Sequence, residues 1–182
     1  MINTQTGKGF FTFEQNAELI DASYNIAKKY GVKLVHETHR GKFSFAAHIT
    51  ARFIENIPHL RLGFDASHWC VVAESYLENQ NENVNMAIKR ANHIHARVGH
   101  PEGPQITDPR VPEWEEAVNI HLTWWKKIVE QNKNDGNDLL TVTAEFGPFP
   151  CMTILPYTRQ PISNQWDINV YMMNYLKQLL TN

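Results

Sequence analysis

The chain has 182 residues, of which 42% are hydrophobic and 20% are charged, so its composition excludes disordered and fibrous architectures. Its 17 basic and 19 acidic residues leave a net charge of -2, which gives no electrostatic reason to expect a nucleic acid or an anionic membrane as a partner. Two cysteines are too few for a disulfide framework, and no apolar run approaches the length of a membrane span. We therefore expect one cytoplasmic domain over residues 1–182 that acts on a small molecule.

The first predicted elements are a short strand at Ile2–Gln5 and a helix that begins after Thr12. Thr12 and Gln15 have the spacing of a capping box, which is typical of a helix start. Apolar residues then recur on one helical face as far as Ala27. Gly31 indicates the end of this helix, because glycine readily adopts the left-handed conformation of a helix C-terminus.

Four further strand-like runs follow, at Val32–Val35, Leu60–Phe64, His93–Ala96 and Leu139–Ala144. Four segments with helical spacing lie between or after these strands. The first contains Phe45, Ile49 and Phe53, and the second contains Ala87 and Ala91. The third is residues 113–131 after Pro112, and the last is Asp167–Leu180. Strands that alternate with helices in this way predict a parallel sheet crossed by helices. The Trp124–Trp125 pair is expected to pack within its helix interface rather than to bind a sugar.

The predicted fold class is α/β, a partial (β/α) TIM barrel of about five parallel strands with outer helices. A closed barrel of this type has eight strands, so about three βα units are expected to be missing. An open remnant would expose apolar strand edges and inner-face side chains. We therefore expect self-association, or a partner fragment that covers the open sheet.

Four candidate metal ligands lie at the ends of four predicted strands: Glu37, Asp65, His95 and Glu145. The C-terminal edge of the strands is where barrel active sites are built. Each residue alone is compatible with a loop cap or a solvated side chain. Together, three carboxylates and one imidazole suit Mn²⁺, Mg²⁺ or Co²⁺, with Zn²⁺ also compatible.

The motifs around these residues carry a family resemblance. HETHRG at 36–41, DASHW at 65–69, HARVGH at 95–100 and AEFGP at 144–148 occur in the order and spacing of the xylose-isomerase-like sugar phosphate isomerase/epimerase superfamily. The resemblance extends from the region around Thr6–Gly7 to the final helix. It is carried by the C-terminal part of the barrel, since nothing here corresponds to the first three strands of that family, which contribute part of the substrate pocket.

The resemblance implies a function and a set of site residues. A Glu, an Asp, a His and a Glu at four strand ends bind the catalytic divalent metal in the family, which corresponds to Glu37, Asp65, His95 and Glu145. The residues at the positions of the family's substrate contacts are His68 and Arg97. Two other roles stay open: Arg97 could pair with a surface carboxylate, and His68 could cap a helix or orient Asp65.

The expected chemistry is isomerisation or epimerisation of a sugar or sugar phosphate through a metal-stabilised enediolate. Glu37 and Glu145 would remove and return the carbon-bound proton, while Arg97 and His68 would hold substrate oxygens. His36, His39 and His100 also lie near the expected site, but the sequence does not fix their direction. Two alternatives remain: a non-catalytic, truncated metal-binding remnant of the barrel, and a phosphodiesterase resembling the apurinic endonucleases, which would need a basic groove and additional metal ligands.

Overall fold

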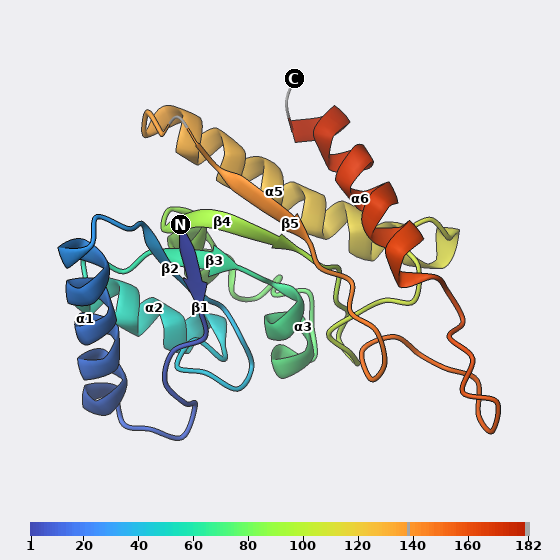
Figure 1. Cartoon of the computed structure of the whole chain (residues 1–182), viewed down its shortest axis with the longest axis horizontal. Helices are drawn as coiled ribbons and strands as arrows, with labels where there is room; N and C mark the ends of the chain where they lie inside the picture. The colour runs from blue at the N-terminus through green and yellow to red at the C-terminus, as the bar shows by residue number, and fades with distance from the viewer. Residues whose placement is uncertain (138, 181–182) are drawn as a thin grey trace.

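The computed structural model describes residues 1–137 and 139–180, which form a curled, open sheet of five parallel strands with helices packed around it (Figure 1). The strands are β1 (Ile2–Thr4), β2 (Leu34–Glu37), β3 (Leu62–Phe64), β4 (Ala91–Ala96) and β5 (Thr141–Ala144). Their order in the sheet is their order in the chain, and every neighbouring pair is parallel. The predicted α/β class and partial barrel are confirmed.

Six α-helices and one short 3-10 helix occur in the described residues: α1 (Phe13–Lys29), α2 (Ala47–Asn56), α3 (Ser67–Ala73), α4 (Asn81–Ile88), η1 (Pro112–Trp114), α5 (Glu115–Asn134) and α6 (Gln165–Leu180). The capping box that begins α1 is confirmed, since the Thr12 hydroxyl accepts a hydrogen bond from the Gln15 amide and the Gln15 side chain accepts one from the Thr12 amide. None of the helices described combines the length and hydropathy needed to cross a membrane.

The connection between β3 and β4 differs from the prediction. Ala91 was placed on a helix by its spacing from Ala87, but α4 ends at Ile88 and Ala91 is the first residue of β4. Its position is fixed by pairing with Leu62 of β3, a tertiary contact that helical spacing cannot reveal. The connection also contains a second helix, α3, whose end is marked by Glu74 in the left-handed conformation (φ 49°).

The hydrophobic core lies between the sheet and the helices. Phe64 and Ile94 contribute to it from the strands and Trp69 from α3, and all three are fully buried. The adjacent residues Trp124 and Trp125 on α5 are 7% and 0% exposed, which confirms that this pair packs in the helix interface. The segment between β5 and α6, by contrast, extends away from the body of the molecule (Figure 1).

Candidate metal and substrate site

Each predicted ligand lies at the C-terminal edge of a different strand. Glu37 is the last residue of β2. The strand thus ends two residues after the predicted end at Val35. Asp65 follows β3, His95 is the penultimate residue of β4, and Glu145 follows β5. Because the strands are parallel and in register, these four positions come to the same edge of the sheet.

Three of the four side chains converge closely. One ligand atom from each of Glu37, Asp65 and His95 lies within 4.8 Å of the other two, and all three residues are buried. Glu145 does not join this group directly, but its Oε2 is hydrogen-bonded to His95 Nδ1. Its side chain is one-third exposed (33%), so Glu145 closes the outer side of the cluster.

Asp65 is held by three hydrogen bonds. Its Oδ1 accepts from the Ser67 amide (2.9 Å) and from the Ser67 hydroxyl, and its Oδ2 accepts from Arg97 Nη2 (2.6 Å). A carboxylate offers about four lone-pair positions, two on each oxygen. One position on Oδ2 is therefore left, which is what a monodentate metal ligand requires.

Arg97 and His68 are both tied to this buried carboxylate. Arg97 is 7% exposed, and its partner Asp65 is fully buried, so the alternative that Arg97 pairs with a surface carboxylate is wrong. Arg97 Nη2 lies 2.7 Å from His68 Nε2, and His68 Nε2 lies 3.7 Å from Asp65 Oδ2. His68 therefore reaches Asp65 mainly through the guanidinium, and both side chains face the centre of the candidate site.

The pKa values of the cluster reflect competition between burial and charge. Complete burial alone would raise the pKa of Asp65, but Arg97 and His68 outweigh it and hold that pKa below its usual value. Burial raises the pKa of Glu37, and the attraction of His95 offsets this only in part. Burial would lower the pKa of His95, but its hydrogen bond to Glu145 prevails and raises it.

The charge balance of the cluster fits a divalent cation. When Glu37, Asp65 and Glu145 are ionised, three negative charges face the single positive charge of Arg97. Buried charges that lack a partner are strongly unfavourable, so a divalent ion bound here would compensate the excess of two carboxylates. Oxygen ligands with one imidazole are the donors expected for Mn²⁺, Mg²⁺ or Co²⁺, and are acceptable to Zn²⁺.

Sequence reasoning missed two amides that complete the cluster, one on β1 and one just after it. Asn3 Nδ2 donates to Glu37 Oε2 (3.2 Å) and lies 2.9 Å from His95 Nε2, while Gln5 Nε2 donates to Glu37 Oε1 (3.1 Å). Gly63 makes room for this arrangement, because a Cβ at that position would lie 2.6 Å from Asn3 Oδ1. Polar residues at alternate positions of a strand expected to be buried were the available signal.

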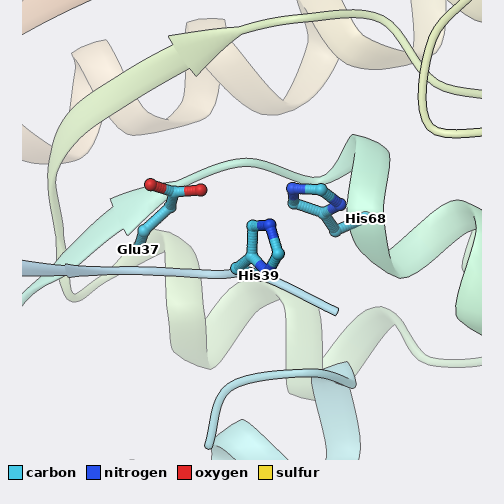
Figure 2. A group of neighbouring side chains, drawn as sticks. All are labelled: Glu37, His39 and His68. Atoms are coloured by element: carbon cyan, nitrogen blue, oxygen red, sulfur yellow. The ribbon is translucent and has the colours of Figure 1, made fainter. Parts of the chain in front are cut away.

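The three histidines whose direction the sequence does not fix occupy different places. His39 lies at the site, where one of its nitrogens, one of His68 and one oxygen of Glu37 form a second group within 4.8 Å (Figure 2). His36 is buried against Phe43, and its Nδ1 lies 2.7 Å from the Thr6 hydroxyl. Burial lowers the pKa of His36 to about 4, so this residue is a neutral part of the packing.

His100 is not part of the cluster. Its backbone pairs with Gly103 in a short bridge, and its ring lies 4.8 Å from that of Trp114, measured between centroids. This imidazole thus contacts the loop that follows β4 and the η1 helix beyond it.

A cleft of about 830 Å³ lies at the opposite, N-terminal edge of the sheet. Four basic side chains line it, at Lys28, Lys33, Arg61 and Lys89. Arg61 donates to the carbonyls of Pro58 and Leu60 just beyond the end of α2, and Lys28 lies in the last turn of α1. Cations at helix C-termini stabilise the helix dipole, which accounts for basic residues at this edge.

Comparison with protein-family models gave no match to the chain, and comparison with curated proteins gave none either. The resemblance to the xylose-isomerase-like superfamily therefore depends on the four sequence motifs and their placement.

Proposed function

We propose that this chain is a divalent-metal-dependent isomerase or epimerase of sugars or sugar phosphates, related to the xylose-isomerase-like superfamily. The observation that carries the proposal is the convergence of Glu37, Asp65 and His95 within 4.8 Å, with Glu145 bonded to His95, at the C-terminal edge of a curled parallel sheet. Four residues separated by up to about a hundred positions in sequence would not be expected to meet by chance at the edge where barrel enzymes place their active sites.

Glu37, Asp65, His95 and Glu145 are the residues that would hold the metal ion. Bound there, a divalent cation would supply Lewis-acid polarisation of a carbonyl and its neighbouring hydroxyl, which would make the carbon-bound proton easier to remove. The amides of Asn3 and Gln5 orient the Glu37 carboxylate for this role. Ser67 and Arg97 do the same for Asp65.

The proton transfer is assigned to the two glutamates. Glu37 ends β2 and Glu145 follows β5, so they approach the site from two sides with two strands between them. One carboxylate removes the proton from carbon and the other returns it on the opposite face, which gives epimerisation; return to the neighbouring carbon gives isomerisation. Arg97 and His68, at the positions of the family's substrate contacts, would hold substrate oxygens.

Two measurements on the purified chain test this proposal. Metal analysis after dialysis against Mn²⁺ should show binding that Glu145→Gln and Asp65→Asn weaken, whereas Glu130→Gln, on the exposed face of α5, should leave it unchanged. The Mn²⁺-loaded chain should then exchange the proton next to the carbonyl for deuterium in some member of a panel of free and phosphorylated ketoses, read by NMR.

The alternatives give different results in the same measurements. Metal binding without exchange on any ketose would favour the non-catalytic remnant, and cleavage of DNA at abasic sites would favour the phosphodiesterase. If the wild type bound no more metal than the Asp65→Asn variant, the proposal would be overturned.

The proposal includes a partner for the sheet edges. β1 and β5 each pair with only one strand among the described residues, and Ile2 (52% exposed) and Val142 (40% exposed) lie on them. Unpaired edges with apolar side chains favour association, so we expect a second copy or a partner fragment to cover them. A solution mass equal to one chain across the micromolar range would contradict self-association.

A further inference from the structure

The group formed by Glu37, His39 and His68 has the composition of a second metal site, and it shares Glu37 with the first (Figure 2). We propose, on the basis of the function proposed above, that it is instead a recognition site for a substrate hydroxyl, in which His39 supplies a fixed hydrogen-bond donor. The proposal assigns a role to a residue that the metal and proton-transfer chemistry does not use.

The hydrogen bond from Gly41 determines which nitrogen of His39 carries the proton. The Gly41 amide donates to His39 Nδ1 at 3.1 Å. A backbone N–H can only donate, so Nδ1 is unprotonated and the proton of the neutral ring is on Nε2. To bind a metal through Nε2, the ring would have to move that proton to Nδ1, where it would face the Gly41 N–H donor to donor.

His68 is equally unsuited to bind a second cation. Its Nε2 lies 2.7 Å from Arg97 Nη2, and a guanidinium has donors only, so Nε2 accepts a hydrogen bond from a cationic group. The Nε2 of His95, by contrast, lies beside the neutral amide of Asn3. The proton of His68 is then on Nδ1, which is buried and has no hydrogen-bond partner. The positive charge of Arg97 at this distance would also repel a second metal ion.

The arrangement that remains matches a hydroxyl group. His39 rises between Glu37 and His68 with a ring nitrogen toward the space between them (Figure 2). With Nδ1 occupied by Gly41, Nε2–H is the group free to donate into that space, and the Glu37 carboxylate beside it can accept. A hydroxyl both accepts and donates, so a polyol oxygen satisfies both groups, whereas a deoxy position would leave them unpaired.

Three variants test the proposal. His39→Gln keeps an N–H near the position of Nε2, His39→Leu removes it, and His48→Leu is a matched control on the exposed face of α2. Mn²⁺ titration should give one ion per chain in the wild type and in all three variants. Two ions per chain in the wild type, falling to one in His39→Leu, would overturn the proposal in favour of a second metal.

Long-range proton–nitrogen NMR on the metal-free chain reads the state of the ring directly. The wild type should show His39 protonated on Nε2, and a ring protonated on Nδ1 would refute the assignment. Failure of the wild type to bind Mn²⁺ at all would count against the proposed function but would leave this measurement standing, so the two failures are distinguishable.

Binding of glycolohydroxamate, a hydroxyl-bearing analogue of an enediolate, to the Mn²⁺-loaded chain tests the contact itself. Its affinity should fall about tenfold in His39→Leu, the effect of losing one neutral hydrogen bond in a desolvated site, and should recover to within about threefold of wild type in His39→Gln. Equal affinity in both variants, or no binding to the Mn²⁺-loaded wild type, would overturn the assignment of His39 as a substrate contact.

Discussion

The buried ion pair between Asp65 and Arg97 gives a sharp prediction because the chain contains a matched pair at its surface. Both Arg97–Asp65 and Arg110–Asp108 have an Nη2–Oδ2 distance of 2.6 Å. The side chains of the first pair are 8% and 0% exposed, and those of the second are 41% and 12% exposed. The two pairs therefore differ strongly in their exposure to water, and the more exposed pair has the better geometry, since Arg110 holds Asp108 through both Nε and Nη2.

Replacing Arg97 by Met leaves a fully buried carboxylate without its counter-charge. Breaking a buried pair in this way costs about 3–5 kcal/mol of folding free energy, whereas an exposed pair contributes at most about 1 kcal/mol. The Ser67 hydrogen bonds to Asp65 remain in Arg97→Met and place the expected loss toward the lower end of that range. Arg110→Met should cost less than about 1 kcal/mol.

Urea unfolding in EDTA at pH 7 measures both variants. The cost of Arg97→Met should shrink as the pH falls below about 4, since the native pKa of Asp65 is held below its ordinary value and the ionised carboxyl stabilises the wild type until the pH falls through that native pKa. Saturating Mn²⁺ should restore part of the loss, because a cation at the same carboxylate replaces the missing charge. If Arg97→Met were no more destabilising than Arg110→Met, the reasoning about buried charge would be refuted.

Three further predictions concern other parts of the structure. Asn3→Ala should weaken Mn²⁺ binding by about tenfold, because Glu37 and His95 lose an orienting amide; an unchanged dissociation constant in a calorimetric titration would contradict this. His121 is fully buried and its pKa is lowered to about 4, so at pH 5 it takes up a proton only when the chain unfolds. This uptake destabilises the folded wild type as the pH falls from 7 to 5, and His121→Phe should reduce that loss of stability by about 2 kcal/mol in urea unfolding. Gly99→Ala should destabilise the chain by about 1–3 kcal/mol in thermal unfolding, since the added Cβ would lie 2.7 Å from the Ser67 backbone. The control is Gly147→Ala, whose Cβ meets nothing nearer than 3.5 Å and which should have the smaller effect.

Features set by local sequence could be predicted well. The capping box at Thr12 and the helix stop at Gly31 depend on residues a few positions apart, and both occur as expected. The alternation of short runs with helical segments predicts the five strands and their parallel order. Parallel order places Glu37 and Asp65 at one edge of the sheet.

Features set by contacts between distant residues could not be predicted. Ala91 fits a helical face by spacing, yet its pairing with Leu62 makes it part of a strand. The amide of Asn3 reaches His95, 92 positions away, and nothing near Asn3 in the sequence indicates that partner. The direction of His39 depends on one backbone hydrogen bond within a loop, which has no periodic signal at all.

The sequential strand order has a consequence for how the molecule comes into being. Each strand adds to the one made just before it, so a nascent chain can extend the sheet stepwise without waiting for distant segments. The proposed metal site is completed later, because Glu145 follows the last strand. A ribosome-bound chain stalled after α5 should thus already pair β1 to β4 while still lacking one of the four proposed metal ligands.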